Sequence, residues 1–378
     1  MQSLEPTTSR RALAGTLRSL QGGLPSAVIG FDGFIDEMIR LVGERSDLET
    51  YAAIPTITAF GDLVSKAAGR SSLREIVVTD VHPGGCAINM GDGLAALGVP
   101  VDAFATLGAP PHPAFAAITR RFRTVESWGS QPGRTLAFEF SDGKVMFSSV
   151  SQLAELTPAH ARARLAAGRF AAACAEAGLI ALTDWTLYPH MTAVWRLLQK
   201  EVFAGLTQRP RFFIDLVDPS GRTAAEIAEM LSLLVGFETA GTLTLGLNGN
   251  EANIAARILN LPLAQPECAE SVQIQAAALR EALGISEVVI HQIKVAVAAD
   301  ARGTVALVGP YCAQPVKSTG AGDRFNAGYA LGLMLDLDAG SRLLLGCGSS
   351  GYFVRHGRSP SLDELSAFLD QDAWWAAG

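Results

Sequence analysis

Short apolar runs alternate with longer Ala- and Leu-rich stretches along most of the chain. The runs have the length of buried strands and lie at residues 27–29, 101–106, 179–183, 212–216, 242–247 and 288–291. The stretches between them carry apolar residues at helical spacing, at 158–177, 186–204, 223–233 and 271–283. Strands that alternate with helices predict an α/β fold, in which a mostly parallel central sheet is covered by helices on both faces.

Two segments depart from this rhythm, because their apolar and polar residues alternate with a period of two. They lie at 75–81 and at 135–150, the second around the turn signal Ser141-Asp142-Gly143-Lys144. Such alternation predicts half-exposed antiparallel strands. We therefore expect a small β-strand lid on the α/β body, with strands from about 36–45, 75–82 and 134–150.

The N-terminal segment has a helical pattern of its own. Leu13, Leu17 and Leu20 share one face of a helix predicted at 8–20, which Gly22-Gly23 and Pro25 end. The sequence contains no fixed-period repeat and no low-complexity linker. We predict an N-terminal helical extension over 1–25 and one domain over 26–378 that includes the lid.

Composition and charge exclude several classes of protein. Apolar residues make up 49% and charged residues 18% of the 378 residues, which fits a compact globule. The 30 basic and 37 acidic residues give a net charge of −7 without a basic stripe, so we expect no nucleic-acid partner. The five cysteines include no C-x-x-C pair, and neither a membrane span nor a signal-peptide core is apparent. We predict a cytoplasmic protein with no membrane partner.

The sharpest local signal is a small-residue turn, Ser318 to Asp323, that opens an apolar helix. Backbone N–H groups at such a junction have no intrahelical partner, and the helix dipole adds partial positive charge. The turn can therefore hold negative charge, and Asp323 beside it can accept a proton from a substrate hydroxyl. Taken alone, a Gly-x-Gly-Asp segment is more often a tight turn with a capping Asp, so other parts of the chain must decide.

The segment resembles the second glycine-rich signature of the ribokinase-like, PfkB-type carbohydrate kinases, which ends in Gly-Ala-Gly-Asp. The resemblance implies a three-layer α/β/α sandwich that carries a lid, with ATP and Mg²⁺ as cofactors. It implies that Asp323 is the catalytic base and that Gly320, Ala321 and Gly322 form the anion hole. The implied acceptor is a small sugar or a nucleoside, and a homodimer is kept open.

Three further segments follow the order that this family shows. Gly84-Gly85-Cys86-Ala87-Ile88-Asn89 resembles the first signature, in which the two glycines and the Asn face the sugar. Asn248-Gly249-Asn250-Glu251 resembles the Asn-x-x-Glu motif, in which the Glu organises magnesium through water. The resemblance assigns Asn248, Glu251 and Asn326 to the nucleotide and Mg-phosphate site. It covers the chain from about residue 26 to the C-terminus.

An aspartate near the start of the domain is expected to grip the sugar, and two candidates are present. Asp36 keeps the local Phe-Ile-Asp context of the family, although it lies six residues after Gly30 rather than five. Asp32 is the reserve candidate, and its alternative role is to hydrogen-bond the adjacent glycine turn.

Three departures from the family pattern concern the nucleotide, the cation and the loop near the substrate. The segment 289–296 lacks the two glycines of a Thr-x-Gly-x-x-Gly motif, and His291 or Lys294 could contact phosphates instead. Lys317 stands where many members carry an Asp, which argues against a potassium site, and the segment 106–113 replaces a stretch usually rich in Gly and Asp. The rival hypothesis is a non-catalytic sugar-binding or regulatory protein that kept the fold but lost ATP binding.

A Gly-x-Gly-x-x-Gly match at 346–351 could indicate a dinucleotide site. It follows a helical Leu run rather than a buried strand, and too little chain remains after it for the rest of a nucleotide-binding unit. We interpret these glycines as positions of close helix packing.

Overall fold

A nine-stranded sheet forms the centre of the computed structural model, which describes residues 6–20 and 23–375. Its order is β14-β13-β12-β11-β10-β9-β1-β5-β6. All neighbours from β6 to β12 are parallel, and β13 and β14 add an antiparallel edge. The strands are β1 (Ser26–Phe31), β5 (Val101–Ala105), β6 (Thr124–Ser127), β9 (Ala177–Thr183), β10 (Arg211–Asp215), β11 (Thr242–Asn248), β12 (Glu287–His291), β13 (Val295–Asp300) and β14 (Gly303–Val308).

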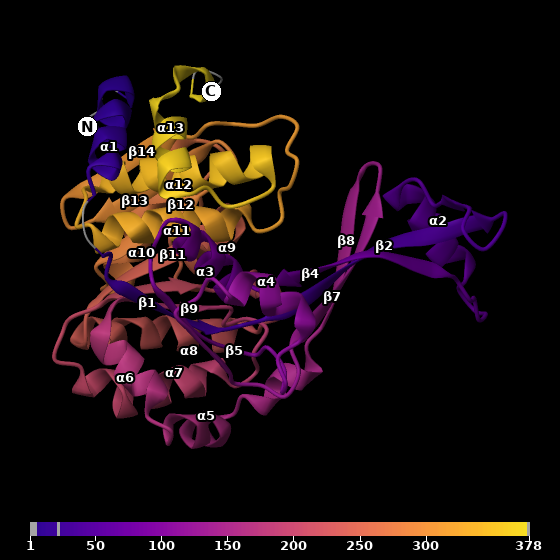
Figure 1. Cartoon of the computed structure of the whole chain (residues 1–378), viewed down its shortest axis with the longest axis horizontal. Coiled ribbons are helices and arrows are strands. Elements are labelled where there is room, and N and C mark those ends of the chain that lie inside the picture. Colours follow the sequence, from indigo (N-terminus) through magenta and orange to yellow (C-terminus); the bar gives the residue numbers. More distant parts are fainter. Residues whose placement is uncertain (1–5, 21–22, 376–378) are drawn as a thin grey trace.

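Helices cover both faces of this sheet, as Figure 1 shows, so the predicted three-layer α/β/α fold with a mostly parallel sheet is confirmed. One layer holds α1 (Pro6–Arg18), α3 (Cys86–Ala96), α11 (Ala321–Met334), α12 (Ala339–His356) and α13 (Leu362–Asp370). The other holds α5 (Pro158–Leu165), α6 (Arg169–Glu176), α7 (Met191–Glu201), α8 (Ala224–Leu233), α9 (Gly249–Ile258) and α10 (Ala269–Leu283). Alternate strand residues feed the two cores: Val28 enters one, and Ala27 and Ile29 enter the other.

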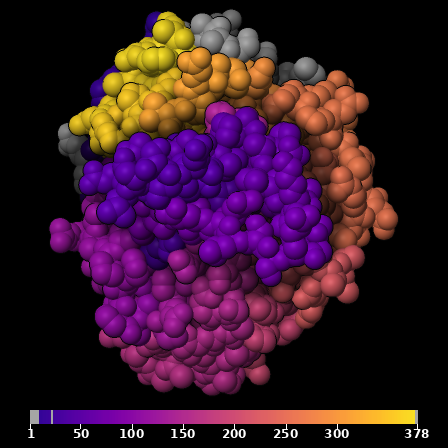
Figure 2. Space-filling model, turned by 90° about the vertical axis from the view of Figure 1, so that its right-hand side faces the viewer, coloured from indigo at the N-terminus to yellow at the C-terminus, as the bar shows by residue number. Residues whose placement is uncertain are grey.

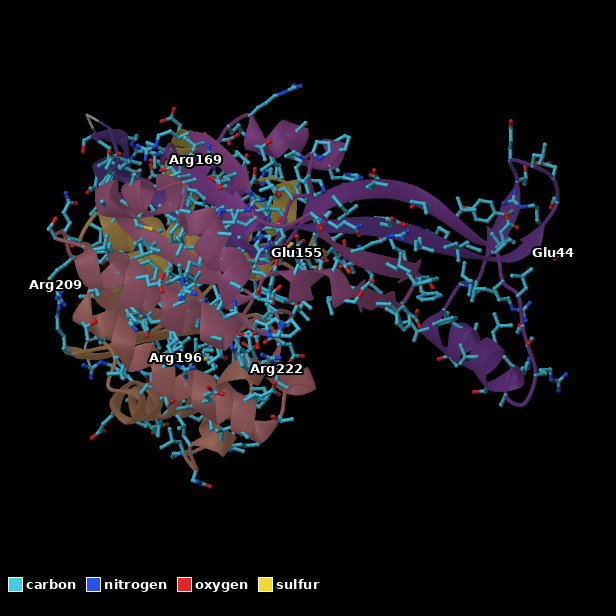
Figure 3. The ribbon with its side chains drawn as sticks, turned by 90° about the horizontal axis from the view of Figure 1, so that it is seen from below. Glu44, Glu155, Arg169, Arg196, Arg209 and Arg222 are labelled. Atoms are coloured by element: carbon cyan, nitrogen blue, oxygen red, sulfur yellow. The ribbon has the colours of Figure 1, made fainter. Side chains whose placement is uncertain are left out.

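A second, smaller sheet projects from the body as an arm (Figure 1). It contains β2 (Phe34–Arg45), β3 (Tyr51–Ala53), β4 (Ile76–Gly84), β7 (Gly133–Phe140) and β8 (Gly143–Ser149), and α2 (Ile57–Lys66) lies near its tip. Glu44 lies at the far end of the arm and Glu155 near its root (Figure 3). In Figure 2, which looks along the arm, its residues cover the upper middle of the molecule. Because β2 follows β1 directly, the root of the arm is fixed to an interior strand of the main sheet.

Several element boundaries differ from the sequence-based prediction. The helix predicted at 158–177 is two helices, because Gly168 adopts the left-handed conformation at φ 75° between them. The helix predicted from residue 186 begins only at Met191, since Pro189 disfavours helical backbone at the residue before it. The predicted N-terminal helix spans 6–18 rather than 8–20, and residues 21–22 lie outside the described part of the chain. Its boundary as an extension near residue 25 stays a prediction.

Helix α1 packs on α13, where Arg10 Nη1 donates to the carbonyl of Leu369 at 3.1 Å. The glycines at 346–351 lie inside α12, and a side chain at Gly346 would meet the ring of Phe325 on α11 at 2.8 Å. The packing interpretation of these glycines is thus confirmed. Over residues 6–20 and 23–375, no helix is both long and apolar enough to cross a bilayer.

Candidate active site

The parallel strands of the main sheet end at one edge, where most of the predicted site residues meet. In open α/β sheets, ligands bind outside the carboxyl ends of the strands. Each polar residue of the group lies at or just after a strand end or in a helix N-terminus at this edge. The residues are Asp32 after β1, Asp184 after β9, Asp215 on β10, Asn248 on β11, His291 on β12, Asn89 on α3 and Asp323 on α11.

Helix α11 begins at the small-residue turn that the sequence singled out. Gly320 is its N-cap and has φ 85°, which a residue without Cβ adopts without strain. Ala321 N–H donates to the Ser318 carbonyl at 3.1 Å, and among the described residues no side chain caps the helix. The next amides, of Gly322 and Asp323, therefore remain available at the positive end of the helix dipole. This arrangement suits an anion.

Asp323 lies in the first turn of α11, and 8% of the residue is exposed. The Nδ2 amide of Asn89 donates to its Oδ2 at 2.9 Å. Burial, followed by the charge of Asp215, raises the pKa of Asp323 from 3.8 to about 7, while Arg324 opposes the shift. A carboxylate with a pKa near the working pH is suited to general base catalysis.

Asp36 lies on β2 at the root of the arm, directly beside the first glycine pair. A Cβ at Gly84 would collide with the Asp36 carboxylate, so the absence of a side chain at Gly84 makes room for it. Burial raises the pKa of Asp36, whereas a hydrogen bond from Thr135 and the charge of Lys317 lower it. Asp36 is half-buried.

Asp32 is enclosed, with 1% of the residue exposed, and its oxygens are already engaged. It accepts hydrogen bonds from the N–H groups of Cys86 and Ala87 and, at 2.6 Å, from the hydroxyl of Thr183. Because Gly85, the N-cap of α3, has no side chain, Asp32 satisfies the first-turn amides from a neighbouring strand. Burial raises its pKa to about 6. Asp36 is therefore the better candidate for a carboxylate that meets a ligand, whereas Asp32 caps the start of α3.

Asn248 and Glu251 form a reciprocal cap at the start of α9. Asn248 Oδ1 accepts from the N–H of Glu251 at 3.0 Å, and Glu251 Oε2 accepts from the N–H of Asn248 at 2.8 Å. Burial, reinforced by Asp215, raises the pKa of Glu251 well above its ordinary value. Asn326 donates to Asp215 at 2.6 Å, whereas its Oδ1 is buried without a hydrogen-bond partner among the described residues.

The side-chain oxygen atoms of Asp215, Glu251 and Asn326 fit a magnesium ion that is held mainly by phosphates and water. Within the described ranges, no cluster of three His, Cys, Asp or Glu residues could hold a metal ion by itself. Mg²⁺ commonly binds one or two carboxylates, substrate phosphates and several waters, so a full protein cage is not required. The orphaned oxygen of Asn326 and the crowded carboxylates of Asp215 and Glu251 match that need.

A cavity of about 790 Å³ opens beside the start of α11. Its volume lies within the usual range for a small-molecule site. His291 on its wall is half-buried, and its desolvation lowers the pKa of the imidazole to about 4, so the ring is neutral near pH 7. It packs on Phe325 with the two rings 4.8 Å apart. Lys294 is exposed, and its Nζ lies 4.9 Å from the centre of the Tyr311 ring. Of the two residues proposed for phosphates, only Lys294 carries positive charge at the cavity.

The turn from β12 to β13, where the two family glycines are missing, is held by a side chain instead. Glu267 accepts hydrogen bonds from the N–H groups of Ile293 at 3.2 Å and Lys294 at 2.9 Å. The Glu267 N–H donates to Gln292 Oε1 at 2.6 Å. A carboxylate thus occupies backbone donors at the edge of the cavity.

Sequence reasoning missed four residues of this region: Asp184, Asp215, Glu267 and Arg324. Asp215 ends a buried strand, and that position is a usable signal. Asp184 follows another strand in the same way. Glu267 gives no local signal, since it contacts a turn that is remote along the chain. Arg324 adjoins the glycine turn, but its burial depends on α3 and on the loop after α12.

Comparisons with known proteins show the family of this chain. Residues 7–372 match the family described as prokaryotic ketohexokinase. A ketohexokinase of Haloferax volcanii is 30% identical over 377 residues, which cover 97% of each chain. A ribokinase of Thermotoga maritima has a TM-score of 0.61 at 17% identity, covering 92% of this chain and 100% of that one. A ribokinase of Arabidopsis thaliana complexed with ribose and ATP has a TM-score of 0.61 at 16% identity, and the match covers 93% of this chain and 100% of that one.

The two solved structures are too distant in sequence to show more than the ribokinase fold. This chain shares that fold with each of them over almost its full length. The family match spans nearly the whole chain and includes every site residue described above. The chain therefore belongs to the prokaryotic ketohexokinase family and is a PfkB-type carbohydrate kinase.

Proposed function

We propose that the protein transfers the γ-phosphoryl group of ATP to a hydroxyl of a ketohexose, with Asp323 as the catalytic base. The acceptor class follows the name of the Haloferax volcanii relative. The observation that carries the proposal is the position of Asp323, a buried carboxylate with a pKa near 7 at an uncapped helix start. It lies between the acceptor-side residue Asn89 and the cavity beside Gly322.

In the proposed reaction the acceptor hydroxyl is oriented by Asp36 and Asn89, next to the two glycines Gly84 and Gly85. As its oxygen attacks the γ-phosphorus, the hydroxyl proton passes to the carboxylate of Asp323. The bond from phosphorus to the bridging oxygen breaks, and ADP leaves with that electron pair. The negative charge of the transferring group is held at the Gly320–Gly322 turn by the free amides of Gly322 and Asp323, because the Ala321 N–H already donates to the Ser318 carbonyl. Positioning and charge stabilisation of this kind supply most of the rate in phosphoryl transfer.

We assign Asn248, Glu251 and Asn326 to the magnesium and phosphate side of the site. When bound, Mg²⁺ neutralises charge on the β- and γ-phosphates. Glu251 would hold the ion through water, because both of its oxygens already accept hydrogen bonds from Asn248. Lys317 lies within electrostatic reach of Asp36 and Arg324, and we keep the expectation that its positive charge argues against a monovalent-cation site.

The arm is proposed to act as a lid that excludes water from the reacting phosphoryl group. Asp36 sits at its root, so a movement of β2 would carry an acceptor ligand with it. The homodimer stays a prediction, and exposed apolar residues on β4 and β8 offer a surface for it: Ile76, Val78, Val81, Met146 and Phe147. A cytoplasmic location likewise stays a prediction.

The test is a screen of the purified protein with Mg-ATP against ketohexoses, aldohexoses, pentoses and nucleosides, followed by ADP release and product analysis. We expect activity on a ketohexose, reduced by about 10²–10⁴-fold in Asp323→Asn, because general base catalysis contributes that much. Asp338→Asn is the matched control, since Asp338 caps α12 by accepting hydrogen bonds from the N–H and the hydroxyl of Ser341. ADP release without transfer would indicate an uncoupled ATPase and contradict the proposal.

The non-catalytic alternative predicts a different result from the same protein. It rests on the missing glycines at 289–296, where Glu267 occupies backbone donors. Sugar binding by calorimetry without measurable ATP affinity or turnover would favour it. Activity on a pentose or nucleoside alone would keep the kinase and change the acceptor.

A further inference from the structure

Arg324, the residue after the proposed base, is a buried cation with a complete set of partners. Only 6% of its side chain is exposed. Nη2 donates to Asp92 Oδ2 at 2.9 Å and Nε to the hydroxyl of Ser359 at 3.2 Å, and the guanidinium carbon lies 4.5 Å from the centre of the Phe353 ring. Burying an ion pair costs several kcal/mol per ion, so its net contribution to stability is small. The position of this pair therefore calls for a role besides stability.

The pair ties the helix of the acceptor side to the helix of the phosphoryl side. Asn89 and Asp92 lie almost one turn apart on α3, and they hold Asp323 and Arg324, which are adjacent on α11. The two helices are in close contact beyond these ties, because a side chain at Gly93 would lie 2.6 Å from the methyl group of Ala327. Two parallel polar links thus set where the first turn of α11 stands relative to Asn89.

Arg324 also contacts the glycine turn itself. Its Nη1 lies 3.5 Å from the carbonyl oxygen of Gly320, which also accepts the first helical hydrogen bond of α11. A Cβ at Gly320 would lie 2.7 Å from that Nη1, so the glycine is needed for the guanidinium to reach the carbonyl. The positive charge therefore stands directly behind the amides that face the transferring group.

We propose that Arg324 is a positioning residue for phosphoryl transfer. Held by Asp92 and Ser359, its guanidinium fixes the carbonyl of Gly320, and with it the direction of the amides of Gly322 and Asp323 relative to Asn89. It also places a permanent positive charge behind the turn, where negative charge develops in the transition state. The inference rests on the proposed kinase function. It adds a residue that acts through the anion turn and touches neither acceptor nor ATP.

The kinetic signature of this role is a loss of turnover without a loss of binding. In Arg324→Met we expect kcat to fall by about 10- to 100-fold, somewhat less than for loss of a direct donor to the reacting oxygen, with both KM values changed by less than about threefold. Arg324→Lys keeps the charge but not the fork of donors, and kcat should recover to within about fivefold of the wild type. The double variant Asp92→Asn with Arg324→Met should have a kcat no lower than that of Arg324→Met alone, because the two residues act as one unit.

Arg342→Met is the matched control for a lost buried ion pair. Arg342 pairs with Glu287 and Asp300, 8% of its side chain is exposed, and it lies on α12 away from the anion turn. We expect it to lower the melting temperature about as much as Arg324→Met and to leave kcat within twofold.

Each outcome of the comparison decides something. If Arg324→Met melts like Arg342→Met and also keeps kcat within twofold, Arg324 is structural and the inference is wrong. If Arg324→Met does not fold, Asp92→Asn decides, and an unchanged kcat in that variant overturns the inference. Wild-type protein that releases no ADP in the acceptor screen would overturn the proposed function instead, so the two failures can be told apart.

Discussion

The two sides of the proposed reaction centre are built differently. The acceptor side is formed by side chains. Asp32 and Asp323 are buried and hydrogen-bonded, and glycines leave room for Asp36. On the nucleotide side, an open cavity of about 790 Å³ is bordered by the turn that Glu267 holds. Buried side chains that pack closely tolerate little change. A cavity lined by backbone and loops can still bind its ligand when the side chains around it change. Mutations should therefore cost more on the acceptor side.

The largest effect expected from a binding residue is at Asp36. Asp36→Ala should raise the KM for the acceptor by about 10- to 150-fold, because a hydrogen bond to a charged group contributes about 1.5–3 kcal/mol. The KM for ATP should stay within twofold, since Asp36 lies at the root of the arm and outside the nucleotide cavity. Initial-rate kinetics with each substrate varied in turn measure both values.

Glu37→Gln is the matched control on the same strand. Glu37 pairs with the exposed Arg134 at 2.7 Å, and successive residues of a strand point to opposite faces. An equal rise in acceptor KM for Glu37→Gln would mean that any damage to β2 has this effect, and Asp36 would lose its assigned contact.

The second prediction concerns pH, and the expected effect is about tenfold per pH unit below the pKa of Asp323. With a pKa of about 7, Asp323 is increasingly protonated below neutral pH, so kcat/KM should fall as pH decreases from 8 to 5. Three charged groups affect this pKa: Asp215 on β10, Asp32 after β1 and Arg324 on α11. A pH–rate profile that is flat over this interval would contradict the assignment of Asp323 as the base.

Stability should move in the opposite direction over the same interval. The folded-state pKa of Asp323 lies above its unfolded value of 3.8, so the folded protein binds more protons between about pH 4 and pH 7. Its contribution to the free energy of unfolding therefore decreases as pH rises through that window. Asp323→Asn removes this penalty, and its melting temperature should exceed that of the wild type above pH 7.

The same contrast explains how much of the molecule could be predicted from the sequence. The alternation of strands and helices is enough for the α/β/α fold, because a parallel sheet buried on both faces needs continuous apolar strands. The first turn of α11 was recognisable because its glycines and Asp323 are adjacent in sequence. Asp32 and Asp36 could not be separated, since the difference depends on which one reaches the amides of α3.

Residues that act through distant contacts escaped prediction. Glu267 supports the turn at 293–294 from more than 20 residues away. The burial of the Arg324 cation is explained by partners that are equally remote along the chain, Asp92 and Ser359. The segment 289–296 lacks the expected glycines, yet it still forms the end of β12, a turn and the start of β13. The carboxylate of Glu267 holds this turn, and no local sequence pattern reports such a contact.

The smallest effect is expected at Lys294, on the nucleotide side. Lys294→Met should raise the KM for ATP by about three- to fivefold, because an exposed cation near phosphates is screened by water and salt. The effect should shrink further at 0.5 M salt, and the KM for the acceptor should not change. His291→Gln is the control: His291 is neutral near pH 7 and should show no salt-dependent change in ATP KM. If Lys294→Met instead cost as much as Asp36→Ala, the nucleotide would depend on side chains as strictly as the acceptor does, and the proposed contrast between the two sides would be wrong.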